Sequence, residues 1–299
     1  MIPPISFADA YLAARTYLFA RSRKFPKLSK LLSEENRQVL TIAYAFFRIA
    51  DDMVDEEHVT LEQFQVWRTQ TRRPPEEQSD PILAAWAYMH GKLNQRYAEN
   101  ILDGIEMDIY KSRYDSFDEL LRYNYLVSCS VGLMGLPYIG VRPGQHEQAA
   151  PYIEKMTMAL QMTNLLRDVG ADLKDGRIYL PADKLAQFGL TYADIEALRC
   201  DARFKNLMRH LISITRQMFV DAWPCLSYLT PIGRLFCGLG IATWDVLLNE
   251  IERIDYDVFS TRIRLPGKKM AWLMLTRWPE FVWPRVGPTE ETKTVEVGG

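Results

Sequence analysis

Two runs of this sequence place aspartates at helical spacing, while almost every other position in each run is apolar. In the first run, residues 44–56, four polar side chains share an arc of roughly 60° on a helix that turns about 100° per residue. They are Tyr44, Arg48, Asp51 and Asp55. A solvated helix face would be wider and richer in charge. The narrow stripe therefore predicts a helix that is buried on most sides and borders an internal cavity.

The second run, residues 161–181, repeats this pattern. Its polar side chains fall within an arc of roughly 80° by the same geometry. They are Gln161, Asn164, Asp168 and Asp172, and their companions include Leu160, Met162, Leu165, Leu166 and Val169. The two stripes are expected to face one cavity.

Paired aspartates of this kind call for a counter-charge. Like charges four residues apart on a helix repel by a few tenths of a kcal/mol, and two facing pairs cost more unless protons or cations neutralise them. Carboxylates with space between them suit Mg²⁺, which binds one or two carboxylates together with substrate phosphates. The neighbouring cations Arg48, Arg167, Lys174 and Arg177 could hold phosphate oxygens. The pattern predicts ionisation of a diphosphate, with apolar walls that shield a carbocation from water.

A structural interpretation of the same residues stays open for part of the pattern. Arg48 and Asp52 are four residues apart, so an ordinary intrahelical ion pair could explain them. Arg167 has no acid four residues further on, because Ala171 stands there. A lone DDxxD run often occurs by chance, but two stripes with apolar flanks favour the catalytic interpretation.

Helical periodicity dominates the chain and strand alternation is scarce, which predicts an all-α fold. We find no internal repeat and no linker, so we expect one helical domain over residues 1–287, followed by a polar, disordered tail over 288–299. The glycines and proline at 132–140 predict either a helix end with a turn or a kink close to a ligand. The expected helices are 7–20, 34–56, 62–69, 81–110, 117–133, 147–173, 203–229, 231–254 and 268–278, with an extended piece at 177–181.

Composition excludes several classes of protein. The formal net charge is -2, so no positive field draws the chain to nucleic acid. The four cysteines form no CxxC pair, which argues against a zinc site and fits a reducing cytoplasm. No signal peptide and no apolar run of about 20 residues stand out. We expect a cytoplasmic protein, either free or peripheral to a membrane. Residues 270–282 combine tryptophans with nearby basic residues, so this segment could lie in a membrane interface, or it could pack on the domain.

These runs resemble the squalene/phytoene synthase family of head-to-head prenyl transferases. YAFFRIADDMVDE and QMTNLLRDVGADLKDGRIYLP are similar to its two aspartate-rich motifs. Thr16-Tyr17, residues 123–132 and residues 250–262 resemble further family segments, so the resemblance covers about residues 10–270. It implies a single helical domain of the isoprenoid-synthase type around a central cavity.

The resemblance also implies roles for individual residues. Magnesium, or Mn²⁺ in its place, would be held by Asp51, Asp55, Asp168 and Asp172, with Asn164 and Gln161 supporting. The arginines Arg48, Arg167, Arg177 and Arg262 would contact diphosphate, as would Gln161 and Asn164, and the tyrosines Tyr44, Tyr123 and Tyr179 would lie at the reacting centre. The family couples two prenyl diphosphates through a cyclopropylcarbinyl diphosphate.

The run from Arg167 to Thr191 most resembles phytoene synthases, which join two geranylgeranyl diphosphates without a reductant. Several positions depart from the family pattern: Ala171 stands where an acid is common, Trp244 replaces a tyrosine, Ser128-Cys129 replaces an Ala-Gly pair, and the basic insertion at 21–30 is longer than usual. A C30 enzyme acting on farnesyl diphosphate is the alternative, whose product would be squalene, dehydrosqualene or presqualene diphosphate and which would need NADPH for squalene. Further alternatives are a single-substrate phosphatase or terpene cyclase, or a non-catalytic scaffold member.

Overall fold

The computed structural model describes residues 4–22, 25–56, 58–261, 263 and 276. Over this part of the chain the regular structure is helical, and the only β-type pairings are two isolated bridges, Arg113 with Ile178 and Val141 with Leu229. The all-α prediction is confirmed. The expected single domain over 1–287 stays a prediction, and the expected helix at 268–278, the proposed membrane segment at 270–282 and the tail at 288–299 lie almost entirely outside the described residues.

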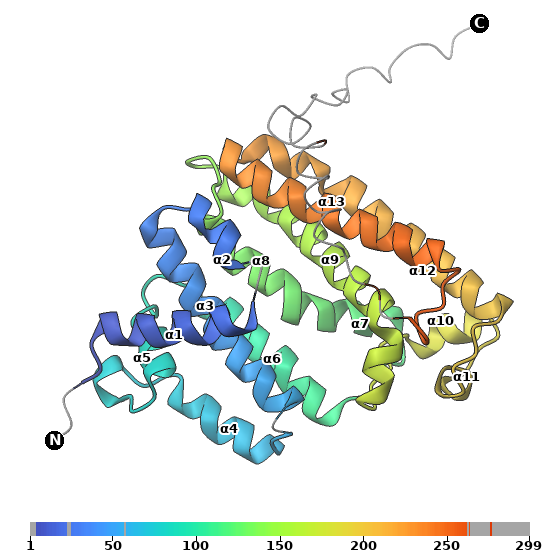
Figure 1. The fold of residues 1–299 in the computed structure, drawn as a ribbon, viewed down its shortest axis with the longest axis horizontal. Helices are drawn as coiled ribbons and strands as arrows, with labels where there is room; N and C mark the ends of the chain where they lie inside the picture. Colours follow the sequence, from blue (N-terminus) through green and yellow to red (C-terminus); the bar gives the residue numbers. More distant parts are fainter. Residues whose placement is uncertain (1–3, 23–24, 57, 262, 264–275, 277–299) are drawn as a thin grey trace, which may run out of the picture.

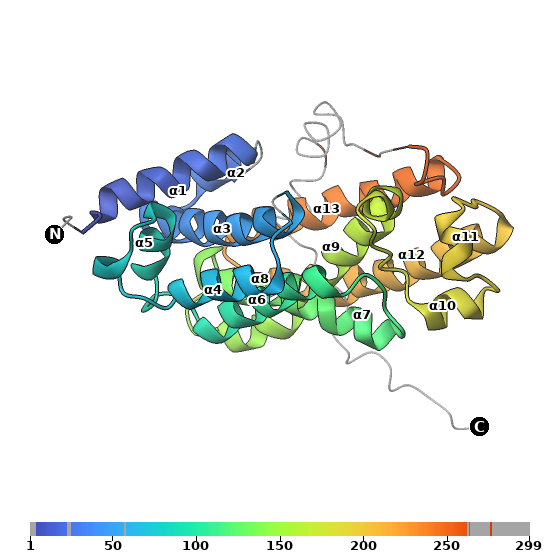
Figure 2. The ribbon, with the colours of Figure 1, turned by 90° about the horizontal axis from the view of Figure 1, so that it is seen from below.

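Long helices cross around the centre of the molecule (Figure 1). Figure 2 shows α3 lying between α1 and α6, and α9 packs against both α12 and α13. The α-helices are α1 (Phe7–Arg21), α2 (Phe25–Leu28), α3 (Glu34–Asp55), α4 (Leu61–Gln70), α5 (Pro81–Ala87), α6 (Gln95–Tyr110), α7 (Phe117–Asn124), α8 (Ser130–Gly135), α9 (His146–Lys174), α10 (Ala182–Gln187), α11 (Tyr192–Glu196), α12 (Ala202–Ala222) and α13 (Pro231–Arg253).

The two motif-bearing helices form where the apolar spacing predicts them. Ser33 caps α3 by accepting a hydrogen bond from the Asn36 N–H, and Glu34 and Glu35 favour the positive end of the helix dipole. The 29-residue helix α9 ends at Lys174, and Gly176 follows at φ +77°, a conformation that glycine adopts without steric cost.

Two helix predictions are wrong in part. The helix expected over 81–110 is broken between Ala87 and Gln95, where turns intervene and the Asn94 side chain accepts a hydrogen bond from the Arg96 N–H to begin a new helix. An asparagine at this position competes for backbone donors and so favours a helix start over a helix interior. The helix expected over 203–229 ends at Ala222, and a 3₁₀ segment, Trp223–Tyr228, follows it.

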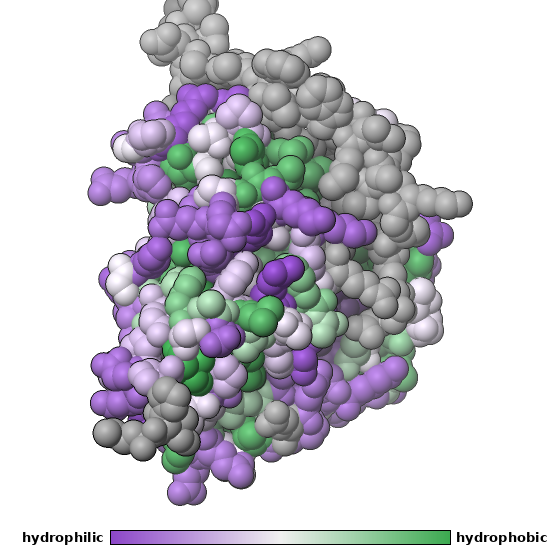
Figure 3. All heavy atoms as spheres, turned by 60° about the vertical axis from the view of Figure 1, so that its left-hand side comes forward, coloured by the Kyte–Doolittle hydropathy of each residue, from purple (hydrophilic) through white to green (hydrophobic). Residues whose placement is uncertain are grey.

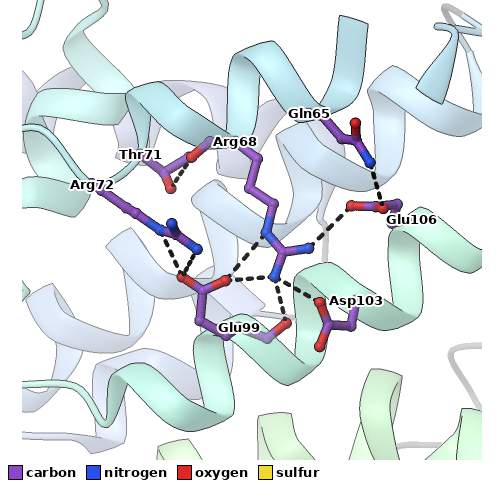
Figure 4. A network of polar contacts seen from close by, with 7 residues as sticks. All are labelled: Gln65, Arg68, Thr71, Arg72, Glu99, Asp103 and Glu106. Atoms are coloured by element: carbon purple, nitrogen blue, oxygen red, sulfur yellow. Dashed lines mark hydrogen bonds and ion pairs between the residues drawn. The ribbon is translucent and has the colours of Figure 1, made fainter. Parts of the chain in front are cut away.

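Ion pairs fasten α4 to the outer face of α6 (Figure 4). The guanidinium of Arg68 binds the carboxylates of Glu99, Asp103 and Glu106 at 2.5, 2.6 and 3.0 Å. Because these acids occupy one face of α6, the opposite, apolar face that includes Ile101 and Ile105 turns toward the interior. The network therefore sets which side of α6 meets the cavity described below.

Close packing at two glycines brings α6, the segment after α7, α8 and α9 together at the cavity. Between α7 and α8 the chain forms a π-helical segment, Tyr125–Cys129, and a Cβ at Gly104 would lie 2.5 Å from the Val127 Cγ1 atom. A Cβ at Gly132 in α8 would lie 2.5 Å from the Thr157 Cγ2 atom of α9. The helix end and turn expected for the glycine-rich segment are present, with Gly140 at φ +100°, and Gly132 lies inside α8 at the cavity wall, while the kink close to a ligand stays a prediction.

One described helix, α13, is long and apolar enough to cross a membrane, although half of its most apolar window is buried. Arg234 and Asp245 interrupt its apolar sequence, so this helix contains no unbroken apolar run of about 20 residues, as expected. A buried core helix satisfies the same criterion, and α13 contributes Leu247, Leu248 and Ile251 to the core.

The face in Figure 3 carries hydrophobic patches between hydrophilic bands. Membrane contact stays a prediction.

Candidate active site

A cavity of about 600 Å³ lies between α3, α6, α8, α9 and α13. Most of its wall is apolar. Its polar lining consists of Tyr44, Arg48, Asp51, Asp108, Tyr123 and Gln161, with a thiol from Cys237. The prediction that the first stripe borders an internal cavity is therefore confirmed for Tyr44, Arg48 and Asp51. Such a space, apolar with charges gathered on a few residues, suits a ligand with a long hydrocarbon chain and an anionic head.

The first acidic pair carries an electrostatic cost. Loss of hydration, followed by repulsion from Asp55, raises the pKa of Asp51 to about 6. The Asp51 side chain keeps 43% of its surface accessible because it borders the cavity. Arg48 lies 3.3 Å from the Asp51 carboxylate and partly offsets this cost. A bound cation would relieve the remaining repulsion.

Asp52, beside the pair, has a different role. Its carboxylate is 4% accessible and binds the guanidinium groups of Arg48 at 2.5 Å and Arg21 at 2.6 Å. The Tyr17 hydroxyl donates to it at 2.5 Å. The intrahelical ion pair that the sequence left open is thus formed. This pair directs Arg48 along the cavity wall, while the contacts of Asp52 with Tyr17 and Arg21 tie α1 to α3.

The second acidic pair lies near the end of α9. Burial, followed by repulsion from Asp168, raises the pKa of Asp172 to about 7. Arg167 binds the carboxylate of the adjacent Asp168, with its Nε 2.8 Å from Oδ1, and its guanidinium lies 5.6 Å from the centre of the Trp244 ring. Arg167 is therefore paired in this structure, but with its direct neighbour instead of a residue one turn away.

Arg177 joins the two motifs. Its Nη1 donates to the Asp55 carboxylate at 2.7 Å, although the residues are 122 positions apart. Its backbone N–H donates to the Asp172 carbonyl at 2.8 Å. Arg177 therefore links the two motifs. Of the second stripe only Gln161 lines the cavity, and for Asn164, Asp168 and Asp172 the shared cavity stays a prediction.

One functional candidate, Asp108 on α6, was not found from the sequence. The hydroxyls of Tyr123 and Tyr179 donate to its two carboxylate oxygens at 2.7 and 2.9 Å. Burial raises the pKa of Asp108 to about 6, while both hydrogen bonds act in the opposite direction. The sequence did carry a signal: Asp108 lies about 20° from Ile101 around the helix, so it is an acid on an apolar face.

The other predicted residues divide into three groups. Tyr44 stands at the cavity wall with its ring edge-on to Phe25, and Gln161 also lines the cavity. Arg262 lies outside the described residues. The remaining predicted residues lie near the motifs without lining the cavity; they are Asp55, Asn164, Arg167, Asp168, Asp172, Arg177 and Tyr179.

The donor set fits a hard divalent cation. It consists of two carboxylate pairs, in which Asp55 helps to raise the pKa of Asp51 and Asp168 that of Asp172, and carboxylate oxygen is the ligand that Mg²⁺ prefers. Within the described ranges no group of three or more Asp, Glu, His or Cys side chains is placed to share one ion. Each pair would therefore hold an ion together with oxygens from the ligand, the usual arrangement for magnesium bound to a phosphate compound.

Comparison with known proteins gives consistent matches. The family model described as squalene/phytoene synthase matches residues 18–269. A phytoene synthase of Arthrospira platensis is 32% identical over 294 residues, which cover 93% of this chain and 95% of that protein. The chloroplastic phytoene synthase 1 of Arabidopsis thaliana is 32% identical over 257 residues, covering 82% of this chain and 60% of that longer protein.

Solved structures share the fold at lower identity. A dehydrosqualene synthase in complex with a ligand superposes with a TM-score of 0.78 at 22% identity, over 90% of this chain and 95% of that one. The squalene synthase HpnC from Alicyclobacillus acidocaldarius gives a TM-score of 0.72 at 22% identity, over 85% and 97% of the two chains. The helical arrangement around the cavity is thus the isoprenoid-synthase fold.

Proposed function

The chain belongs to the squalene/phytoene synthase family of prenyl transferases, and from this membership we propose that it condenses two molecules of geranylgeranyl diphosphate head to head to phytoene. The observation that carries the proposal is the apolar cavity next to two acidic motifs linked by Arg177. The names of the relatives at 32% identity support the choice of C20 substrates.

We assign the binding of the diphosphates to the charged end of the site. Mg²⁺, or Mn²⁺ in its place, would be held by Asp51 and Asp55 on α3 and by Asp168 and Asp172 on α9, with Asn164 beside them. Bound there, the ion would neutralise charge on the departing diphosphate. Arg48, Arg177 and Arg167 would exchange their present carboxylate partners for phosphate oxygens.

The apolar walls then decide the fate of the carbon skeleton. Loss of the first diphosphate leaves an allylic cation, which alkylates the double bond of the second substrate and, with loss of a proton, closes a cyclopropylcarbinyl diphosphate. Loss of the second diphosphate, rearrangement and loss of another proton give the linear product. Water that reached either cation would divert it to an alcohol, so the mostly apolar lining favours coupling. Tyr44 and Tyr123 stand at this wall.

The test is a product analysis. Purified protein with Mg²⁺ is incubated separately with farnesyl and geranylgeranyl diphosphate, with and without NADPH, and extracted products are identified by mass. A C40 hydrocarbon from the C20 substrate without NADPH, lost in Asp51→Ala and Asp168→Ala, is expected. A C30 product would keep the mechanism and overturn the substrate choice, while a prenyl alcohol, a cyclic terpene or no turnover would overturn the coupling reaction.

A further inference from the structure

A buried hydrogen-bond cluster adjoins the cavity wall beside the first acidic motif. Asp108 borders the cavity, and its two oxygens accept one hydrogen bond each, from Tyr123 and from Tyr179. The two tyrosines are 4% and 8% accessible and their ring centres lie 5.3 Å apart. Both contact the fully buried ring of Tyr114, on which Tyr179 stacks and against which Tyr123 is tilted. The rings are thus held rigidly by packing, and Asp108 fixes the one freedom that remains, the direction of each O–H bond.

This direction determines what the hydroxyls present to the cavity. A phenol has one proton to donate, and both tyrosines direct it to the same carboxylate. The two hydroxyl oxygens lie 3.4 Å apart, a longer contact than either bond to Asp108, so the carboxylate is the preferred acceptor for both. The lone pairs of the Tyr123 oxygen therefore receive no proton from Asp108 or Tyr179, and this hydroxyl, on a residue that lines the cavity, is polarised by a neighbouring anion.

We propose that Asp108 is a positioning residue that orients the hydroxyls of Tyr123 and Tyr179, so that an electron-rich oxygen faces the cationic carbon skeleton. The inference rests on the proposed function, because it assigns this oxygen to the carbocations of that reaction. Fixed dipoles directed at developing charge in a site that excludes water are worth far more than the same dipoles in water. Asp108 need not touch the substrate, because it acts through the two tyrosines.

The position of Asp108 fits this role better than a purely structural one. It makes no ion pair with the described residues, and the pKa of its carboxyl responds to both Arg177 and Asp55 at the junction of the two motifs. By contrast, Asp52 binds two arginines and fastens two helices together. Asp108 is therefore the acid that links the charged end of the site to the tyrosines.

The first experiment exchanges one atom. Asp108→Asn keeps the shape of the side chain but replaces one acceptor by an N–H donor, so one tyrosine must turn its proton away. We expect kcat to fall about 100-fold or more with KM changed less than about threefold, the pattern for a contact made only in the transition state. Tyr114→Phe is the matched control: its hydroxyl makes no hydrogen bond within the described part of the chain, so its removal should leave kcat unchanged.

A double-mutant cycle tests whether Asp108 acts through the tyrosines. In a Tyr123→Phe, Tyr179→Phe background, Asp108→Asn should lower kcat less than about threefold, because no hydroxyl is left to orient. An undiminished loss in this background would overturn the proposal. The cycle is measured with the prenyl diphosphate that the protein turns over, either C15 or C20. A C30 product would therefore contradict the proposed substrate and leave the role of Asp108 testable.

A second readout does not depend on activity. In protein labelled with ¹³C at tyrosine Cζ, the resonances of Tyr123 and Tyr179 are assigned from their phenylalanine variants. Both should shift in Asp108→Asn, while the signal of Tyr97 on the same helix should not. Unchanged Tyr123 and Tyr179 resonances in a folded Asp108→Asn protein would overturn the proposal even if activity were lost.

Discussion

Arg177 donates a hydrogen bond to Asp55 at 2.7 Å, and its own backbone N–H is held by the Asp172 carbonyl at 2.8 Å. The guanidinium is mostly buried, with 17% of the side chain accessible, whereas Asp55 keeps 41% accessible. A cation thus stands between two anionic pairs without neutralising either completely. Under the proposed function, Arg177 would leave Asp55 for a phosphate group when divalent cations bind.

Substitution of Arg177 tests this exchange. Arg177→Gln removes the charge while keeping a hydrogen-bond donor, and a charge-assisted hydrogen bond contributes about 1.5–3 kcal/mol. We expect kcat/KM for the diphosphate substrate to fall roughly 10- to 100-fold, measured by steady-state kinetics. Lys205→Gln, which breaks an ion pair with Asp255 away from the cavity, is the control. Equal losses in both variants would show that general destabilisation is responsible.

Removal of the divalent ion should reveal the acidic pairs as its ligands. We expect EDTA to abolish turnover and Mg²⁺ or Mn²⁺ to restore it. Mg²⁺ with inorganic diphosphate should also raise Tm in proportion to the logarithm of ligand concentration, and Asp51→Asn or Asp168→Asn should reduce this shift. Asp103→Asn on the outer face of α6 serves as control: it can lower Tm but should retain the ligand-induced shift. An unaltered shift in Asp51→Asn would exclude it as a ligand.

Local periodicity explains why the acidic stripes could be found from sequence. The stripe positions on α3 and α9 depend only on helical spacing, and their burial follows from apolar neighbours such as Phe46 and Leu166. How closely the two stripes approach each other depends on tertiary packing. The sequence supported their proximity only indirectly, because two like-charged stripes need cations to neutralise them. Arg177 provides this link in the structure.

Asp108 could not be assigned in the same way. Its two partners lie 15 and 71 residues away, and no local pattern relates them. The break between α5 and α6 was missed for a related reason: an asparagine at residue 94 is tolerated in a helix but favours a cap, and tertiary packing decides between these. The partners of Arg167 and Arg48 likewise depend on side-chain rotamers that spacing does not determine.

The Arg68 network should stabilise the cavity wall from outside. Arg68 is 15% accessible and binds three carboxylates, so Arg68→Ala would leave Asp103 and Glu106 without their counter-ion and Glu99 with the exposed Arg72 alone. We expect the free energy of unfolding to fall by about 1–3 kcal/mol, measured by urea denaturation. Arg72 is the matched control, because it is 67% accessible and binds Glu99 alone, and Arg72→Ala should cost less than about 1 kcal/mol. Equal effects would contradict a buried network.

The capping box at the start of α11 predicts acid sensitivity. Hydrogen bonds from the hydroxyl and the N–H of Thr191, helped by Arg203 and Arg199, lower the pKa of Asp194 to about 2. The unfolded value is about 3.9, so the stabilisation is fully present above about pH 5 and is lost as pH falls through 4 toward 2. Asp194→Asn should therefore lower Tm at pH 7, and the difference from the wild type should narrow below pH 4. The exposed Asp221→Asn should show no such narrowing.

Gly240 on α13 offers a test of how the cavity measures chain length. It lines the cavity, and a Cβ added there would meet no atom within 4 Å, so a larger side chain would extend into the empty space and displace no neighbour. Gly240→Leu should cost no stability, since leucine favours a helix over glycine by up to about 1 kcal/mol. We expect kcat/KM for geranylgeranyl diphosphate to fall at least about tenfold, because lost space for methylene groups in an apolar pocket costs about 1–3 kcal/mol of binding free energy. The value of kcat/KM for the shorter farnesyl diphosphate should fall less than about threefold. Gly91→Leu, at an exposed turn with equal free space, is the control. Equal losses for the two substrates would mean that the hydrocarbon tails do not reach α13, and that another wall of the cavity selects chain length.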